Sequence, residues 1–236
     1  MDDFGGYAAG LRRSSRWVIG LYAVATLLLM AAVGLDLTAT VMHPQTWNDP
    51  YAPVSESEAQ IAAAMVGVSL LGLGVWVLAL IVFLRFFHRI TKTTHEFAAE
   101  IVETSPGWAV GWWFVPIANL WKPYGVIKRL FTANDPATLA GERGIPPVAL
   151  IGWYWAVWII SSVLSQATFR MTQSPDPSVV ETAVYIDVAT SVLDVVALVL
   201  LYKWVTLLRD WHLAKITRSD YAEDAAPEGE LPTLEY

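Results

Sequence analysis

Three carboxylates lie within stretches of sequence that are otherwise apolar enough to cross a membrane. Asp36 belongs to the first stretch, and Asp187 and Asp194 belong to the fourth. Helix geometry places Asp194 about 15 Å into its stretch, near the bilayer centre, and places the other two toward the outer leaflet. An ionised carboxylate at the centre costs about 3 kcal/mol, so a functional role is the first hypothesis for Asp194.

Serine and glutamine side chains in the third stretch are candidate partners for these carboxylates. Together they predict a polar cavity that opens to the outside, with Asp194 protonated, hydrogen-bonded or solvated. The alternative is that each group forms only an interhelical hydrogen bond. We favour this alternative for Asp36 and Asp187, whereas for Asp194 both interpretations stay open. The candidate intramembrane site comprises Asp194, Asp187, Asp36, Ser165 and Gln166.

The histidines do not form a pattern typical of a metal site. His88 and His95 are seven residues apart with Glu96 beside them, but metal sites use three or four converging ligands at diagnostic spacing. The chain has no cysteine, and its sequence holds no phosphate-binding loop, nucleophile elbow or zinc-protease signature. We therefore expect no metal, no cofactor and no enzymatic activity.

The most distinctive stretch combines tryptophans with prolines over residues 105–131 and is named the Trp/Pro segment here. Ser105 is suited to cap a helix whose first residue is Pro106. Pro116 should break that helix, and Pro123 can open another. The pattern predicts a helix, a break and a second helix.

The Trp/Pro segment is too short to cross the membrane, since residues 107–121 give about 22 Å of helix. Residues 107–118 carry no charge, which argues against an ordinary surface helix. We expect the segment either to dip into the cytoplasmic leaflet or to dock on the bundle; a simple aromatic belt is the alternative. Its candidate contact residues for lipid or a partner are Pro106, Gly107, Trp108, Gly111, Trp112, Trp113, Pro116, Asn119, Trp121, Lys122, Pro123 and Tyr124.

The elements that position these residues follow from composition. The chain is 55% hydrophobic and only 16% charged, which is typical of a membrane protein. The predicted fold is an all-α integral membrane four-helix bundle, with an interfacial or re-entrant helix-break-helix between the second and third spans. The spans cover about residues 17–42, 61–87, 147–169 and 184–208. Residues 1–218 form the membrane domain, and 219–236 form an acidic tail expected to be disordered.

Orientation follows from the basic residues. Of the 15 lysines and arginines, all except Arg170 fall on one side of this topology, which leaves 14 there. The positive-inside rule therefore places both termini and the 88–146 connection in the cytoplasm. These bases should attract anionic lipid on that face, and no nucleic-acid partner is expected.

The Trp/Pro segment resembles the hallmark of the bacterial membrane proteins grouped as domain-of-unknown-function family 4328. The match runs almost residue for residue from Pro106 to Tyr124, and it is also dense in the basic run Arg85–Lys92. The resemblance implies a multi-pass protein of the bacterial plasma (inner) membrane, and it supplies no catalytic residues.

The leading hypothesis is a non-enzymatic structural or regulatory membrane module whose Trp/Pro segment binds lipid, a membrane-protein partner or a second copy of the chain. The alternative is a small transporter or channel that uses Asp194. A lipid-modifying enzyme would need converging acid–base, nucleophilic or metal-binding groups, and the spacing of residues provides none.

Overall fold

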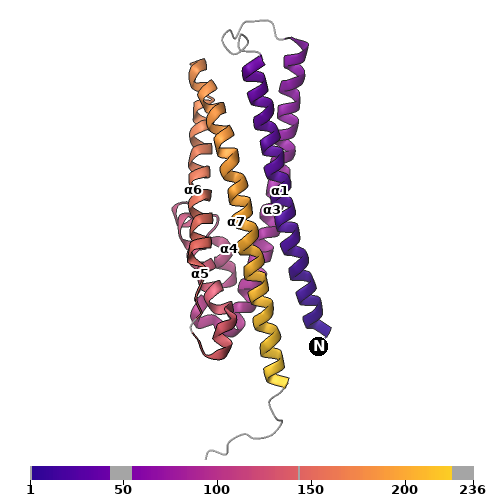
Figure 1. Ribbon diagram of the computed structural model, residues 1–236, viewed down its shortest axis with the longest axis vertical. Coiled ribbons are helices and arrows are strands. Elements are labelled where there is room, and N and C mark those ends of the chain that lie inside the picture. The colour runs from indigo at the N-terminus through magenta and orange to yellow at the C-terminus, as the bar shows by residue number, and fades with distance from the viewer. Residues whose placement is uncertain (1, 43–54, 143, 225–236) are drawn as a thin grey trace, which may run out of the picture.

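Four long apolar helices run along one axis of the computed structural model, which describes residues 2–42, 55–142 and 144–224 (Figure 1). They are α1 (Asp2–Met42), α3 (Glu56–Val102), α6 (Val148–Met171) and α7 (Pro177–Asp224). Each is long and apolar enough to cross a membrane. The described residues form helices and turns without a strand, so the predicted all-α class is confirmed, and the four long apolar helices are consistent with the four predicted spans.

Three of these helices are much longer than a membrane span requires. The helices α1, α3 and α7 have 41, 47 and 48 residues. At 1.5 Å per residue they extend about 60–70 Å, twice the thickness of the hydrocarbon core. Helix α7 continues to Asp224 and so includes residues 219–224 of the predicted tail. The rest of that tail, 225–236, lies outside the described residues.

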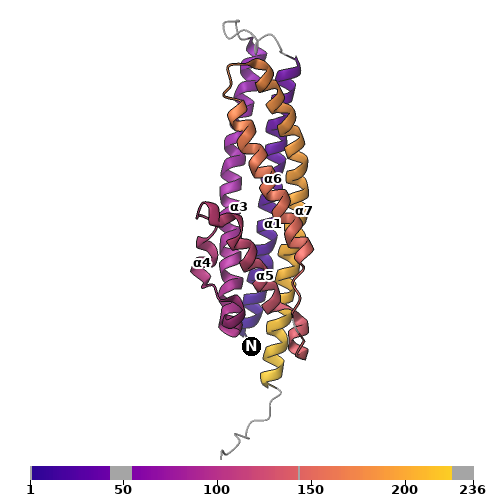
Figure 2. The ribbon, with the colours of Figure 1, turned by 90° about the vertical axis from the view of Figure 1, so that its left-hand side faces the viewer.

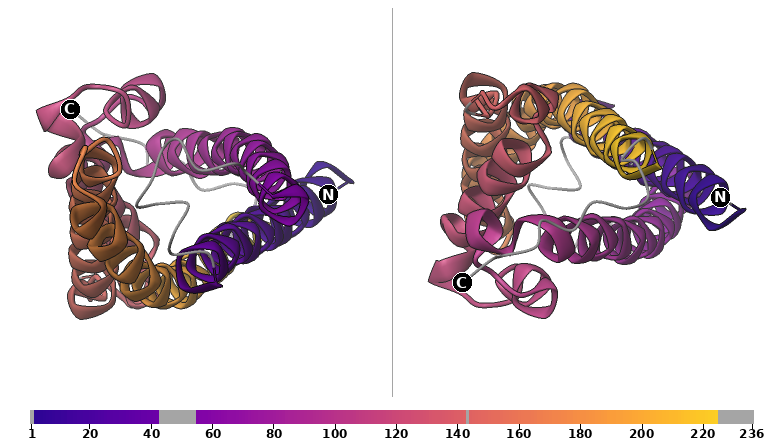
Figure 3. Two further views of the ribbon diagram at one scale, coloured as in Figure 1. Left: turned by 90° about the horizontal axis from the view of Figure 1, so that it is seen from above. Right: turned by 90° about the horizontal axis from the view of Figure 1, so that it is seen from below.

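The long helices form a curved row rather than a closed bundle. Helix α1 packs along both α3 and α7, and α6 packs along α7. Seen along the axis, the order is α3, α1, α7, α6, and the two end helices of this row have no extended contact with each other (Figure 3). A gap therefore separates α3 from α6.

The connection between α3 and α6 folds back on the end of α3. It contains α4 (Pro106–Gly111), a 3-10 turn η1 (Ile117–Leu120), α5 (Lys122–Asn134) and a second 3-10 turn η2 (Pro136–Ala140). Figure 2 shows α4 beside α3, with α5 descending next to both. The end of α3 and the middle of α5 are joined by an ion pair of 2.8 Å between Glu103 and Arg129. The segment thus begins and ends at the same end of the helices.

A buried hydrogen-bond network fixes the far end of α5. The Tyr7 hydroxyl of α1 donates to His212 Nε2 of α7 over 2.8 Å, and His212 Nδ1 lies 2.8 Å from Asn134 Oδ1. The Asn134 amide donates to Thr94 Oγ1 of α3 over 3.0 Å and to the Leu130 carbonyl over 2.8 Å. Four helices therefore meet in one network of polar side chains.

This network holds His212 neutral and in one tautomer. Because the Asn134 oxygen can only accept, His212 Nδ1 carries the proton and Nε2 accepts from Tyr7. His212 is fully buried and lies four residues beyond the predicted fourth span. Burial, and to a lesser extent the Arg89 guanidinium, lower the pKa of His212 from 6.5 to about 4.

The lowered pKa predicts a loss of stability in mild acid. Between pH 6.5 and 4 the unfolded chain binds a proton at His212 that the folded chain does not, so the free energy of unfolding falls as the pH falls through this window. The expected loss is about 2 kcal/mol between roughly pH 7.5 and pH 5. Thermal unfolding in detergent, followed by near-ultraviolet circular dichroism, should show a weaker pH dependence in His212→Gln than in the unaltered protein. The exposed His88→Gln is the matched control, and equal pH dependence in both variants would refute the assignment.

Candidate functional site

The first helix of the Trp/Pro segment begins where the sequence predicts, but it ends before the predicted break at Pro116. Ser105 Oγ accepts the Trp108 backbone N–H over 3.4 Å, and Pro106 occupies the first turn. Helix α4 ends at Gly111, five residues before Pro116, and the chain then turns over residues 112–116. Ile117 follows with a φ of 38°, a conformation that is strained for a β-branched residue.

The inner face of the segment is built around Trp113. Its ring lies 5.1 Å from Phe83 and 6.0 Å from Phe87 of α3, both in edge-to-face geometry. The same ring lies 5.8 Å from Trp155 of α6. The Trp113 side chain therefore bridges α3 and α6, the two end helices of the row.

A second set of contacts ties the segment to α6. Trp155 Nε1 donates to the Leu120 carbonyl over 2.6 Å, and the Tyr124 ring lies 5.9 Å from the Trp155 ring. Pro123, at the start of α5, is buried. These contacts hold the segment against α3 and α6.

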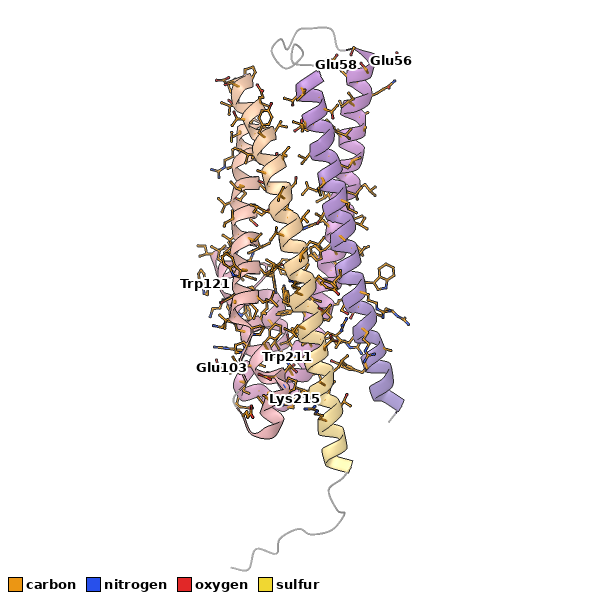
Figure 4. All side chains as sticks on the ribbon, viewed as in Figure 1. Glu56, Glu58, Glu103, Trp121, Trp211 and Lys215 are labelled. Carbon is orange, nitrogen blue, oxygen red and sulfur yellow. The ribbon has the colours of Figure 1, made fainter. Side chains whose placement is uncertain are left out.

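The outer face of the segment is apolar and uncovered. Three of its large side chains are more than half exposed: Trp108 (56%), Ile117 (73%) and Trp121 (52%). Figure 4 shows Trp121 at the periphery of the molecule, nearer the middle of the long axis than Glu103. Exposed apolar side chains at this density are typical of a surface that contacts lipid or another protein.

Basic side chains border this outer face. Lys122 Nζ lies 5.1 Å from the centre of the Trp112 ring, and Lys128 Nζ lies 5.4 Å from that of Tyr124. Both distances are within the range of cation–π attraction. The Trp112 ring also packs on Trp108, with 4.7 Å between centroids.

The glycines and two of the prolines of the segment make few packing contacts. Pro106 is half-buried, and Pro116 is exposed. A Cβ added to Gly107 would meet nothing within 4 Å, and one added to Gly111 would meet only the Trp108 ring, at 3.3 Å. The two glycines therefore do not mark a close approach between helices.

A cavity of about 630 Å³ lies in the middle of the molecule. Its walls come from α1, α3, α6 and α7, and Trp113, Phe114 and Asn119 of the Trp/Pro segment complete them. The buried Trp113 Nε1 and Asn119 Oδ1 atoms have no hydrogen-bond partner in the described part of the chain. The segment therefore contributes both a free donor and a free acceptor to the region of the cavity.

Of the predicted intramembrane site, only Asp194 reaches the cavity wall. The Ser161 hydroxyl of α6 donates to the Asp194 carboxylate, which joins α6 to α7. Asp187 and Asp36 are half-buried and lie within electrostatic range of each other. The remaining predicted members are exposed on α6 and are not part of this wall: Ser165 and Gln166.

The sequence interpretation missed the aromatic residues that receive Trp113. Phe83 and Phe87 are spaced four apart on α3, which puts two rings on one helix face, and this spacing was the available signal. Trp204 of α7 packs on Phe83 at 6.0 Å and extends the cluster. Among the described residues, no group of three His, Cys, Asp or Glu side chains is placed to hold a metal ion.

Comparison with known proteins adds one match. A family model described as "Domain of unknown function (DUF4328)" matches residues 51–209, which include α3, the Trp/Pro segment, α6 and most of α7. No curated protein and no solved structure matches the chain.

Proposed function

Since the chain belongs to the DUF4328 family, whose domain has no assigned function, we propose that it is a non-enzymatic structural or regulatory module of the membrane. In this proposal the Trp/Pro segment contacts lipid of the cytoplasmic leaflet with its outer face, while its inner face closes the gap between α3 and α6. The observation that carries the proposal is this division of one short segment into a docked face and an apolar uncovered face.

The division separates side chains within one short segment. Trp113 makes ring contacts with two helices, whereas Trp108 and Trp121 are 56% and 52% exposed. Ile117, whose backbone has a strained positive φ, is 73% exposed. Apolar side chains exposed in this way are stabilised by lipid, because contact with the acyl chains removes them from water.

The proposed orientation puts this face in the cytoplasmic leaflet of a bacterial inner membrane. Basic residues gather where the N-terminal part of α1 meets α3 and α7: Arg89 donates to the Tyr7 carbonyl over 3.4 Å, and Arg209 donates to Ser15 over 2.9 Å. Lys215 lies at this end in Figure 4, and Glu56 and Glu58 lie at the other. Anionic headgroups would be attracted by about 1 kcal/mol per base.

The non-enzymatic assignment is supported by the chemistry of the segment. Between Gly107 and Ala118 it carries no titratable side chain, so it offers no general acid, base or nucleophile. The Ser105 cap, the helix break and the aromatic contacts are features of a segment that packs against other helices.

The lipid contact predicts how a spin label at the tip will behave. The chain has no cysteine, so Ile117→Cys can be labelled alone in nanodiscs that contain anionic lipid. We expect the label to collide readily with oxygen and little with a water-soluble nickel chelate. Leu70→Cys, 64% exposed on α3 within the second span, is the lipid reference, and Glu100→Cys is the water reference.

Two results would contradict the lipid assignment. Nickel accessibility at position 117 equal to that at position 100 would mean that the tip faces water. A label at 117 shielded from both reagents would mean that protein covers this face, and the partner would then be a polypeptide.

A second candidate function is a small transporter or channel that uses Asp194, and the observation that favours it is the position of this carboxylate on a cavity wall. If Asp194 takes part in permeation, Asp194→Asn should abolish proton-linked flux in proteoliposomes. Asp187→Asn, on the same helix and away from that wall, should leave the flux unchanged. Equal flux in the two variants would rule this function out.

A further inference from the structure

The walls of the central cavity combine aliphatic side chains with aromatic rings, and the rings come from three of the four long helices and from the Trp/Pro segment. The volume of about 630 Å³ is in the range of sites for small organic molecules. The rings that line it are those of Tyr22, Trp76, Phe83, Trp113, Phe114, Tyr154 and Trp158. Aromatic faces carry partial negative charge and attract cations that have lost their hydration.

One carboxylate, that of Asp194, shares these walls without a positive partner. The Ser161 hydroxyl donates to it, but among the described residues no lysine, arginine or histidine forms an ion pair with it. A carboxylate in such surroundings is stabilised by a cation that enters the cavity.

Besides the Asp194 carboxylate, the cavity wall holds a hydrogen-bond acceptor that has no partner. Asn119 Oδ1 is buried and receives no hydrogen bond. Among the described residues that line the cavity, the Trp113 indole N–H is a donor without a partner, so the unpaired groups include a donor as well as an acceptor. Of the residues described along these walls, Asp194 is the one Asp, Glu, Lys or Arg.

We propose that this cavity binds a lipophilic organic cation, whose charge lies beside Asp194 and whose apolar body packs against the aromatic walls. A neutral ligand would leave the carboxylate without a positive partner, and an anion would be repelled by it. The inference is independent of the lipid-facing role of the Trp/Pro segment. It names a ligand for the second candidate function, and equilibrium binding can be observed whether or not flux occurs.

Binding of tetraphenylphosphonium to the full-length protein in phosphatidylcholine nanodiscs tests the proposal. We expect saturable binding beyond that of empty nanodiscs, and Asp194→Asn should weaken it by about tenfold or more, as expected for a lost desolvated charge contact. Asp187→Asn is the matched control, because it removes a carboxylate from the same helix outside the cavity wall, and its affinity should be unchanged.

A second variant keeps the test decisive if Asp194→Asn alters the fold. Ala32 lines the cavity, so Ala32→Phe fills part of it, leaves the carboxylate in place and should abolish binding. The proposal is overturned if no saturable binding occurs, if the two aspartate variants bind equally, or if Ala32→Phe binds like the unaltered protein. Saturable binding of tetraphenylborate, which matches the probe in size and carries the opposite charge, would also overturn it.

Discussion

The side chain of Trp113 occupies the gap that the helix order leaves between α3 and α6, and the rest of the arrangement depends on it. Helices α3, α1, α7 and α6 form an open row, so the two end helices need a third element between them. Trp113 provides it through ring contacts with Phe83, Phe87 and Trp155. Three contacts of this kind contribute about 3 kcal/mol together, beyond the burial of the ring itself.

Other features of the site follow from this contact. With Trp113 directed inward, Ile117 after the turn at residues 112–116 lies on the uncovered apolar face, whereas Phe114 lines the central cavity. The same contact places Asn119 on the wall of the central cavity. The Trp113 side chain therefore both connects α3 to α6 and forms part of the cavity wall. At the end of α5, the buried His212 network holds the returning chain against α1, α3 and α7.

Local chemistry in the sequence was sufficient to predict the elements. Runs of about 20 apolar residues identify the four spans, and the Ser105 cap and Pro123 fix helix starts within the Trp/Pro segment. The directions of side chains could not be predicted, because they depend on tertiary packing. The adjacent indoles Trp112 and Trp113 are equivalent in sequence, and only the early break of α4 turns the second toward the helices.

The same limit explains the misplaced polar residues. Ser165 and Gln166 are exposed on α6, although Ser161, one turn earlier, is buried and donates to Asp194 of α7. The partners in the His212 network are separated by 40 to 205 residues, so no local pattern signals them.

The distance between α3 and α6 tests the role of Trp113 most directly. Spin labels at Leu70→Cys and Val163→Cys, both exposed, report this distance by double electron–electron resonance. In Trp113→Ala the distance distribution should shift and broaden relative to the unaltered protein, and Trp113→Phe should largely restore it. Trp108→Ala, which removes an exposed indole from the same segment, should leave it unchanged. An identical distribution in Trp113→Ala and Trp108→Ala would show that Trp113 does not hold the two helices in place.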